Sequence, residues 1–372
     1  MNLTKKLFSY IVAIAMIFTL TAFAGGAVNA AEGTTSEVPP YTLTLNGTTK
    51  GHTYEAYQIF TGDLSTNAEG KKVLSNVKWG TGVTYTGTES AADVAKALGN
   101  EKTMTLDTLI GKLTLTKPVK TVDSSKDSTS TVIDGLVAGY YLVKDKDGTQ
   151  ANTSDAYTKF IVKVVGDTEA DIKSGVPTVE KKVKDTNEST GDTSEWQDSA
   201  DYKIGADVPY QITGTMPANI ADYTTYKYIF TDTMSKGLTY TANTARITIG
   251  DKDVTSSFNE VVTPNEDGST VVTWTCDNLK DIVKDIEGVT LTKDTKVVVT
   301  YSATLNEHAV IGAAGNPNTV NLTYSNNPNN GGSGETGTTP EDKNIVFTYK
   351  TVVNKVDQDQ KTLAGAGFKL EK

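Results

Sequence analysis

The stretch Val179-Glu180-Lys181-Lys182-Val183-Lys184 has an alternating pattern that indicates the fold class. Successive side chains of an extended strand point to opposite faces, so Val179, Lys181 and Val183 share one face. This face is mainly apolar and should point into a protein interior. Similar short runs rich in Thr, Val and Tyr recur along the chain between Gly, Asn and Asp turns. The sequence therefore predicts a mostly β protein made of tandem immunoglobulin-like β-sandwiches.

The first thirty residues have the pattern of a secretory signal peptide. Lys5 and Lys6 precede an apolar run over residues 7–23, and small residues follow up to Ala30. A retained membrane-spanning helix is the alternative, but the apolar run is short and diluted by Ser, Thr and Gly. We expect cleavage after Ala30 and secretion to the cell wall. Cleavage would remove two lysines and make the formal charge of −10 more negative, which argues against nucleic acid as a partner.

The residue types that most often carry enzyme chemistry are sparse. Cys276 is the one cysteine, so an internal disulfide is excluded, and its strand-like surroundings predict a small core residue. His52 and His308 lie in unrelated segments without other ligands at metal-binding spacing. No nucleophile motif or phosphate-binding loop is present either. We therefore expect no cofactor and no metal, and an exported enzyme carried on β modules finds no support.

The length of the chain predicts more than one domain. A segment rich in Asn, Gly and Pro around residues 326–340 is typical of a linker. The few residues after it cannot close a sandwich, so we expect the sequence to stop inside a third domain. The predicted division is a signal peptide over 1–30, an N-terminal domain over 31–172, a second sandwich over 173–326, a linker over 327–344 and the start of a truncated third domain over 345–372.

Strands and two short helices are expected within this division. The helices cover residues 91–98, capped by Ser90, and 104–113, both with an apolar face toward the core. The clearest strands of the first domain cover 41–45, 53–60, 132–144 and 160–165, and those of the second cover 178–183, 226–230, 270–274, 296–301 and 319–324.

Three polar residues of the second sandwich share faces with apolar residues. Lys181 lies between two valines, Asp232 ends an aromatic stripe that begins at Tyr226, and Asn318 is in phase with apolar residues of the expected last strand. An unpaired buried ammonium is costly and would normally lose its proton, whereas a buried carboxyl group would tend to keep its proton. The three in-phase polar residues can therefore be interpreted as one reactive set.

We interpret the set as an intramolecular isopeptide bond. Neutral Lys181 would attack the side-chain carbonyl of Asn318, while protonated Asp232 polarises that carbonyl and moves protons as ammonia leaves. The reaction would occur once per molecule and join the first and last strands of the domain, so the protein would not be an enzyme in the turnover sense. In the alternative, Lys181 reaches water, Asp232 caps a turn and Asn318 opens a strand. Residue parity alone favours this alternative.

A family resemblance favours the first interpretation. It rests on Pro177-Thr178-Val179-Glu180-Lys181-Lys182-Val183-Lys184-Asp185, Phe230-Thr231-Asp232-Thr233-Met234-Ser235-Lys236-Gly237-Leu238-Thr239 and Asn316-Pro317-Asn318-Thr319-Val320-Asn321-Leu322-Thr323-Tyr324-Ser325-Asn326. Together these segments resemble the isopeptide-forming second domain of Gram-positive, sortase-assembled shaft pilins. The resemblance implies a Lys181–Asn318 bond with Asp232 as the catalytic acid. Asn316 and Asn321 are weaker candidates for the amide, the latter because it is out of phase.

The resemblance extends over most of the chain. Residues 54–63 and 138–143 look like the first domain of this family. Residues 353–357 and 363–368 resemble the opening of a collagen-adhesin B-type domain, in which Lys355 would be the amine of another cross-link. Its acid and asparagine would lie beyond Lys372, so that bond is not expected to form here.

The family also implies an acceptor lysine, which a sortase joins to the C-terminal threonine of the next subunit. Lys173 lies at the matching place just before the second domain. The usual Tyr-Pro-Lys-Asn motif is absent because Ile172 and Ser174 flank this lysine, and a solvated linker lysine is an equally weighted interpretation. Lys163 is the second candidate acceptor. The Leu-Pro-x-Thr-Gly sorting signal is absent from the sequence, as expected of a truncated chain.

These features predict a structural subunit of a covalently polymerised cell-surface pilus. The implied partners are a pilin-specific sortase, further copies of the chain joined head to tail, and minor pilins. The alternative is a wall-anchored adhesin or accessory pilin that binds host matrix or cells. A tip adhesin can do without an acceptor lysine, so Lys173 distinguishes the two.

Overall fold

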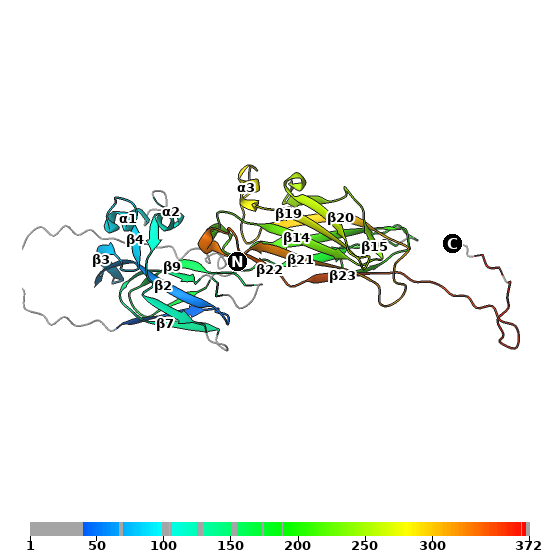
Figure 1. Cartoon of the computed structure of the whole chain (residues 1–372), viewed down its shortest axis with the longest axis horizontal. Helices are drawn as coiled ribbons and strands as arrows, with labels where there is room; N and C mark the ends of the chain where they lie inside the picture. Colours follow the sequence, from blue (N-terminus) through cyan, green and yellow to red (C-terminus); the bar gives the residue numbers. More distant parts are fainter. Residues whose placement is uncertain are drawn as a thin grey trace, which may run out of the picture.

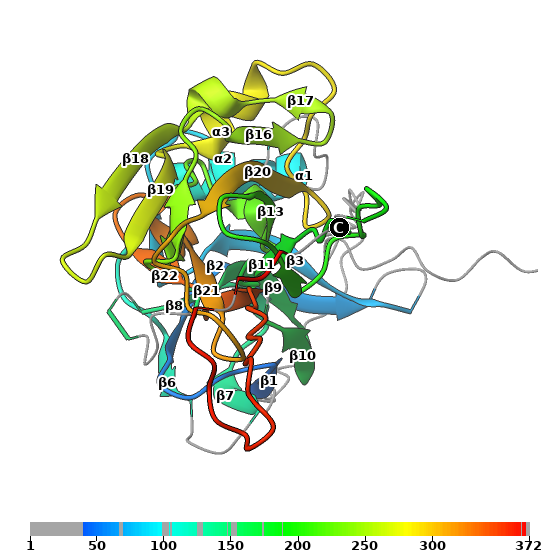
Figure 2. The same ribbon diagram turned by 90° about the vertical axis from the view of Figure 1, so that its right-hand side faces the viewer.

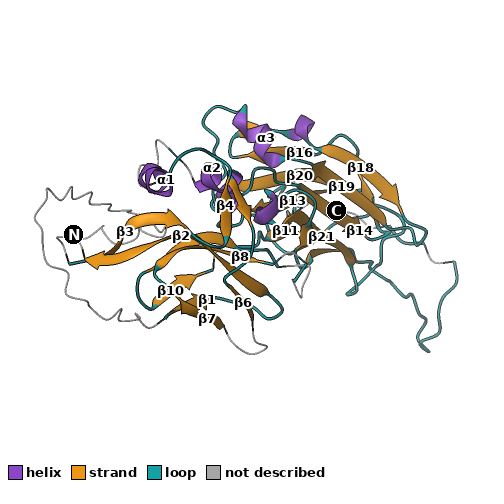
Figure 3. Cartoon of the chain, turned by 60° about the vertical axis from the view of Figure 1, so that its left-hand side comes forward, coloured by secondary structure: helices purple, strands orange, loops and turns teal. Residues whose placement is uncertain are grey.

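The computed structural model describes residues 40–66, 70–98, 104, 106–124, 129–146, 148–149, 155–172, 175–187, 189–365 and 367–369. The predicted signal peptide and Lys173 lie outside the described residues. Two β-rich bodies follow each other along the long axis, with the residues after about 348 extending beyond the second body (Figure 1). Strands make up most of both bodies, as Figure 3 shows, which confirms the predicted fold class.

The first domain consists of two main sheets and a small two-stranded ladder. One sheet has the order β10-β1-β7, and the other has the order β3-β2-β8-β9 with β6 added beside β2. Leu43 and Leu45 of the first sheet and Tyr54 and Val143 of the second belong to one buried cluster. The strands are β1 (Tyr41–Asn46), β2 (Thr53–Thr66), β3 (Lys72–Trp79), β4 (Val83–Tyr85), β5 (Leu113–Leu115), β6 (Lys120–Asp123), β7 (Ser130–Leu136), β8 (Gly139–Asp145), β9 (Lys159–Val164) and β10 (Thr168–Asp171).

The two short helices of this domain are present. Helix α1 (Ala91–Leu98) begins as predicted, because the Ser90 hydroxyl accepts a hydrogen bond from the Asp93 backbone N–H at 3.1 Å. Its apolar residues, including Val94 and Leu98, are buried in the core. Helix α2 (Leu106–Gly111) is shorter than expected, since Leu113 begins strand β5 instead.

The second domain is a sandwich of two larger sheets, seen end-on in front of the first domain in Figure 2. The first sheet has the order β11-β13-β20-β16-β17 with β15 beside β20. It contains β11 (Val179–Val183), β13 (Asp207–Thr215), β15 (Leu238–Tyr240), β16 (Arg246–Ile249), β17 (Lys252–Asp253) and β20 (Lys296–Leu305).

The facing sheet has the order β12-β23-β21-β14-β19-β18 with β22 beside β21. Its strands are β12 (Ser199–Asp201), β14 (Tyr228–Met234), β18 (Asn259–Pro264), β19 (Thr270–Cys276), β21 (Asn316–Ser325), β22 (Thr336–Thr338) and β23 (Asp342–Phe347). A short helix α3 (Leu279–Lys284) and the 3₁₀ turns η1 (Ile220–Asp222), η2 (Thr255–Ser257) and η3 (Pro328–Asn330) complete the domain.

Burial alternates strictly along the central strands of this sandwich. In β14 every second residue from Tyr228 to Met234 is buried, and β20 and β21 have the same period. The inward side chains of both sheets form one continuous core that includes Tyr210, Phe230 and Trp274. Cys276 is buried in this core, in agreement with its predicted role.

The predicted linker over 327–344 is wrong. Asn327 is fully buried, η3 follows it, and β22 and β23 both pair with β21. The Gly331 carbonyl accepts hydrogen bonds from the backbone of Thr224 and Thr225, at 2.9 and 2.8 Å. Many Asn and Gly residues suggested a flexible segment, but here they form tight turns against the sandwich.

The predicted start of the third domain at residue 345 is also wrong. Strand β23 lies between β12 and β21, so residues 345–347 belong to the second sandwich. Beyond Thr348, an isolated bridge joins Val356 to Thr362. Asn318 consequently does not lie on the last strand of its domain, because β22 and β23 follow β21 in the same sheet.

The segment after β21 also joins the two domains. The Tyr157 backbone N–H donates to the Asn326 carbonyl at 2.8 Å, and Lys159 Nζ donates to the Pro328 carbonyl at 2.8 Å. The Asn329 side chain donates to the Asp145 carbonyl at 3.1 Å. In the part of the chain that the structure describes, no helix has the length and apolar character needed to cross a membrane.

Candidate functional site

Lys181 enters the core of the second domain from the first strand of its sheet. The alternation of β11 buries Lys181 and Val183 and exposes Glu180, as the residue parity predicted. The Lys181 side chain is fully buried. Its backbone N–H donates to Asp342 Oδ2 at 2.6 Å, which ties β11 to β23 of the opposite sheet. The interpretation that this lysine reaches water is therefore excluded.

Asp232 and Asn318 reach the same region from the facing sheet. Strands β14 and β21 pair antiparallel, with Asp232 opposite Val320 and Met234 opposite Asn318. The two polar side chains are therefore diagonal neighbours on one face. Both are completely buried, in agreement with the predicted phase of each strand.

The hydroxyl of Tyr301, on β20, connects all three residues. It accepts hydrogen bonds from Lys181 Nζ at 2.6 Å and from Asn318 Nδ2 at 2.9 Å, and it donates to Asp232 Oδ2 at 2.8 Å. Lys181 Nζ also contacts Asp232 Oδ2 directly. An amine, a carboxyl group and an amide thus surround one hydroxyl group in a dry interior.

Aromatic rings enclose the amine. The rings of Tyr210 and Tyr301 stack with centroids 5.2 Å apart, and Lys181 Nζ lies 5.1 Å from the centroid of each. Trp274 also packs against Tyr301, at 5.3 Å between centroids. Such rings attract a cation but provide far less solvation than water. In this enclosure, a positive charge on Lys181 would therefore rely on the carboxylate of Asp232 for its stabilisation.

Burial shifts the two titrating groups in opposite directions. Desolvation lowers the pKa of Lys181, although the charge and hydrogen bond of Asp232 oppose this shift. Desolvation raises the pKa of Asp232, against the opposing effects of Lys181, Tyr301 and Asn318. Both shifts favour transfer of the proton from the lysine to the carboxyl group, because the neutral pair avoids two buried charges. A neutral amine is the form of lysine that can act as a nucleophile.

Two buried oxygen atoms at this site have no hydrogen-bond partner among the described residues. They are Asp232 Oδ1 and Asn318 Oδ1. Both atoms are acceptors while Asp232 is ionised, and without a donor both carry a desolvation cost. A proton on Asp232 would give the carboxyl group a donor beside the Asn318 amide. The arrangement can thus polarise an amide carbonyl within reach of an amine.

The two weaker amide candidates have other surroundings. The Asn316 side chain is buried, but it bonds to the backbone of Val310, at 2.8 and 3.2 Å, and to the Val346 carbonyl at 3.1 Å. Asn321 lies on the opposite face of β21 from Asn318 and is only partly buried. Of these three asparagines, only Asn318 bonds to the Tyr301 hydroxyl.

The remaining predicted lysines lie outside this cluster. Lys163 is on β9 of the first domain, opposite Tyr140, and is half-buried. Lys355 is exposed in the segment after the second sandwich. Lys173, the predicted acceptor, falls between described residues and has no structural account here.

Sequence reasoning did not identify three residues of the site. Tyr301 and Tyr210 sit in apolar stripes, where a tyrosine has the same pattern as any core aromatic residue. Asp342 lay in the predicted linker. Parity in residues 296–301 could have placed Tyr301 inward, but no sequence signal pairs its hydroxyl with Lys181.

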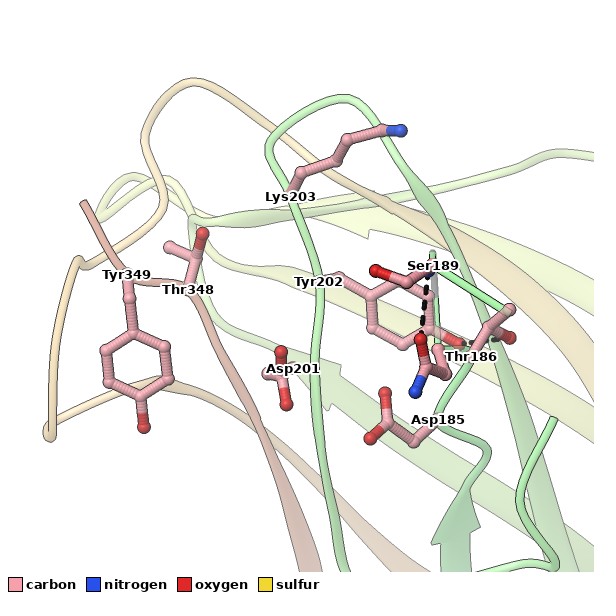
Figure 4. Close-up of a pocket in the computed structure, with 9 residues that line it drawn as sticks. Asp185, Thr186, Ser189, Asp201, Tyr202, Lys203, Thr348 and Tyr349 are labelled. Carbon is pink, nitrogen blue, oxygen red and sulfur yellow. Dashed lines mark hydrogen bonds between the residues drawn. The ribbon is translucent and has the colours of Figure 1, made fainter. Parts of the chain in front are cut away.

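Two further polar features lie outside this cluster. His52, buried in the first domain, donates to or accepts from Asp145 Oδ1 through Nδ1 at 2.7 Å. The described residues nevertheless contain no group of three or more His, Cys, Asp or Glu side chains arranged to hold a metal ion. An open polar pocket near Tyr349 is lined by Asp185, Asp201 and Tyr202 (Figure 4), and it does not include the buried lysine.

Comparisons with known proteins agree with this architecture. The Trypsin-resistant surface T6 protein of Streptococcus pyogenes serotype M6 is 28% identical over 209 residues, which cover 53% of this chain. The chain spans only 36% of the length of that relative.

Solved structures show the same likeness. The T6 backbone pilin of serotype M6 Streptococcus pyogenes superposes with a TM-score of 0.52 at 21% identity, covering 88% of this chain and 68% of that one. This likeness supports the multi-domain β fold. The major pilin SpaD of Corynebacterium diphtheriae matches with a TM-score of 0.40 at 18% identity, over 82% of this chain and 64% of its own.

A family model identifies the domain that holds most of the site. The model describes a Gram-positive pilin backbone subunit 2, Cna-B-like domain, and it matches residues 204–328. Asp232, Tyr301 and Asn318 lie inside the match, while Lys181 precedes it on β11. Residues 204–328 are therefore similar to the second domain of Gram-positive pilin backbone subunits.

Proposed function

We propose that this chain is a backbone subunit of a cell-surface pilus, and that an isopeptide bond between Lys181 and Asn318 strengthens its second domain. The observation that carries the proposal is the meeting of Lys181, Asp232 and Asn318 at the Tyr301 hydroxyl in a fully buried space. The match to a pilin backbone domain supports the same function. The bond would form once in each molecule, without turnover.

The reaction exchanges one amide for another. Lys181, as a neutral amine, attacks Cγ of Asn318 and forms the new N–C bond. Asp232 gives its proton toward the Asn318 oxygen and takes one from the attacking nitrogen. It then delivers a proton to Nδ2, so that the old C–N bond breaks and ammonia leaves. As the carbonyl re-forms, its oxygen returns the first proton to Asp232. Close confinement of the groups supplies the effective concentration that an uncatalysed amine and amide lack.

The bond would connect the two sheets of the sandwich. Lys181 belongs to β11 in one sheet and Asn318 to β21 in the other. The covalent link would therefore close a loop of roughly 140 residues. In the chain-entropy model, closing such a loop lowers the entropy of the unfolded chain by an amount worth about 5 kcal/mol. In a shaft subunit under tension, this covalent link would keep the two sheets from separating.

Intact mass of the purified chain tests the cross-link. We expect a mass about 17 Da below that calculated from the sequence, because one ammonia molecule leaves. Lys181→Ala, Asp232→Ala and Asn318→Ala should each restore the calculated mass. Lys182→Ala is the matched control, since Lys182 is the next residue of β11 and its side chain faces away from the core. A full-mass wild-type protein that is folded would contradict the cross-link.

Assembly of the pilus requires a second, intermolecular linkage, for which we propose Lys173 as the acceptor and a pilin-specific sortase as the partner. A strain that carries Lys173→Ala should lose the ladder of polymers in an immunoblot of its cell-wall fraction, whereas Lys163→Ala should keep it. Loss in Lys163→Ala alone would move the acceptor to the first domain. An unchanged ladder in both strains would instead support a wall-anchored adhesin or accessory pilin.

Lys355 is proposed as the amine of a further cross-link in a domain that follows the second sandwich. It is exposed, and its backbone carbonyl accepts a hydrogen bond from Leu363 at 2.9 Å. In the chain of this sequence, Lys355→Ala should leave the intact-mass deficit unchanged. A second loss of ammonia that depends on Lys355 would show that the amide partner of Lys355 lies within this sequence.

A further inference from the structure

A second fully buried amide lies beside the reacting groups. Asn344, on β23, is directly opposite Asn318 in the antiparallel β21–β23 pair. Both asparagines are completely buried. Directly opposed side chains on one face of a sheet have Cβ atoms about 4.5–5.5 Å apart, within reach of two amides.

The side chain of Asn344 makes no hydrogen bond to the described residues that would explain why a polar group is buried here. Neither Asn344 Oδ1 nor Asn344 Nδ2 has a partner among the described residues. A buried amide in this state is costly, and an apolar residue of similar size would avoid the cost. Val346, two residues later on the same face, is such an apolar residue and packs in the core. A polar group that destabilises the resting fold points to a role in another state of the site.

The acceptor atom that lacks a hydrogen-bond donor is Oδ1 of the neighbouring Asn318. Asn318 Nδ2 is occupied by the Tyr301 hydroxyl, whereas Asn318 Oδ1 has no partner in the described chain. The Asn344 amide carries two N–H donors and faces the same interior. A rotation of its side chain would suffice to direct a donor at that oxygen.

We propose that Asn344 is the second donor of an oxyanion site for isopeptide formation. This inference rests on the proposed cross-link. When Lys181 adds to Cγ of Asn318, negative charge develops on Oδ1. The Asp232 proton stabilises this oxygen from one side and an Asn344 N–H from the other. As the tetrahedral intermediate collapses, the bond from Cγ to Nδ2 breaks, ammonia leaves, and Asn344 is released unchanged.

Strand β23 is held so that Asn344 keeps its place. Asp342, two residues earlier, accepts a hydrogen bond from the Lys181 backbone at 2.6 Å. The Val346 carbonyl, two residues later, accepts one from Asn316 at 3.1 Å. The strand is thus tied on one side to the strand of the amine and on the other to the strand of the amide. A donor fixed in advance is what an oxyanion site requires.

The test starts from chain that has never folded, recovered in denaturant at its full mass, and compares rates of cross-linking after transfer to folding buffer, measured as loss of ammonia by mass spectrometry. Asn344→Leu removes the donor and keeps the volume, and Asn344→Asp keeps the shape but replaces the N–H group. Val346→Ala is the matched control, because it creates a cavity on the same face of β23 without touching the reacting atoms. Each change is also made in the Lys181→Ala chain, where thermal unfolding reports folding in the absence of the bond.

We expect Asn344→Leu and Asn344→Asp to slow the reaction by about 100-fold or more, the usual effect of losing one oxyanion donor. In the Lys181→Ala chain, Asn344→Leu should melt no lower than its parent, while Val346→Ala should melt lower and still cross-link at close to the wild-type rate. Cross-linking of Asn344→Leu at the wild-type rate would overturn the inference. So would fragment masses that place the bond on Asn344 itself. A wild-type chain that never loses ammonia would instead contradict the cross-link on which the inference rests.

Discussion

The Tyr301 hydroxyl is the residue-scale feature that organises the site. It accepts from the amine and the amide and donates to the carboxyl group, so it orients all three reacting side chains. Its ring also stacks on Tyr210, which restricts its movement. The hydroxyl therefore contributes positioning, while Asp232 supplies the proton.

Tyr301→Phe should slow cross-linking without preventing it. The change removes hydrogen bonds to Lys181, Asp232 and Asn318, and a hydrogen bond to a charged group is worth about 1.5–3 kcal/mol. We expect the rate to fall by roughly 10- to 100-fold, measured by mass spectrometry as unreacted, never-folded chain is transferred to folding buffer. Tyr228→Phe is the matched control, because that buried hydroxyl bonds to the Thr215 carbonyl at 2.8 Å, outside the cluster. Equal rates for both variants would exclude a role for Tyr301.

The rate of cross-linking should pass through a maximum as the pH changes. Attack needs neutral Lys181, whose pKa burial lowers, and proton donation needs protonated Asp232, whose pKa burial raises. Falling pH protonates the amine, and rising pH removes the proton from the acid, so the rate declines on both sides. Folding of unreacted, never-folded chain in buffers across the pH range, with measurement of the initial loss of ammonia, would reveal the curve. A rate that rises steadily with pH would contradict the role of Asp232.

At the residue scale, alternation along each strand predicted which side chains face the interior. It did not predict which residues meet across neighbouring strands. Lys181, Asp232 and Asn318 were each predicted to face inward because they share a face with apolar neighbours, and all three are buried. The Tyr301 hydroxyl and Asn344 were not predicted. Their roles depend on which strands are adjacent and in which register, and alternation within one strand carries no information about either.

At the scale of elements, the amino-acid composition of the segment after β21 led to the wrong prediction of a linker. Asn, Gly and Pro usually indicate a flexible linker, yet Gly331 and Gly332 have positive φ values and form turns packed against residues 224–225. The following strand β23 then completes the sheet. Helix α1 and strands such as β1, β9, β11 and β19 were predicted within a few residues, because their periodicity is a direct consequence of burial on one face. The predicted run 132–144 is instead two strands, β7 and β8, and strands such as β3, β13 and β18 were not predicted.

Two glycines of this segment provide a paired test of its packing. Gly332 has a φ of 92°, and a Cβ there would lie 2.1 Å from the Thr225 carbonyl oxygen. Gly334 has a similar φ of 89°, but nothing lies within 4 Å of its Cβ position. Both alanine variants carry the cost of a left-handed backbone, about 1 kcal/mol. We expect Gly332→Ala to lose at least about 1 kcal/mol more in denaturant unfolding. Equal losses would mean that the segment is not packed as described.

At the scale of the whole molecule, a buried histidine lies next to the contact between the domains. His52 bonds to Asp145 at 2.7 Å, and Asp155 Oδ2 lies 3.5 Å from its other ring nitrogen. The backbone carbonyls of Asp145 and Asp155 in turn accept hydrogen bonds from Asn329 and Asn326 of the second domain. The charge of His52 should therefore affect how firmly the domains hold together.

Stability of the first domain should decrease as the pH rises through the raised pKa of His52, which lies above the usual 6.5. Burial lowers the pKa of His52, but the hydrogen bond and charge of Asp145 and of Asp155 raise it overall above its usual 6.5. A raised pKa in the folded state stabilises the fold below the unfolded value, and this contribution is lost as pH rises through the folded value. The thermal midpoint, followed by calorimetry, should fall over this range.

His52→Gln should remove this pH dependence and lower stability by about 3 kcal/mol, because it leaves Asp145 buried without its charged partner. His308→Gln is the control, since His308 is exposed on the second domain. The same pH slope in His52→Gln as in the wild-type chain would contradict the assignment to His52.

The single cysteine of the chain lies in the interior between the sheets of the second domain. Cys276 is buried, and burial raises the pKa of its thiol to about 12, so an alkylating reagent meets neither an accessible nor an ionised sulfur. Labelling must await opening of the sandwich. The rate at which the native thiol is modified thus measures how often the two sheets separate. The difference in this rate between wild type and Lys181→Ala shows how far the covalent link suppresses that opening, without any introduced probe.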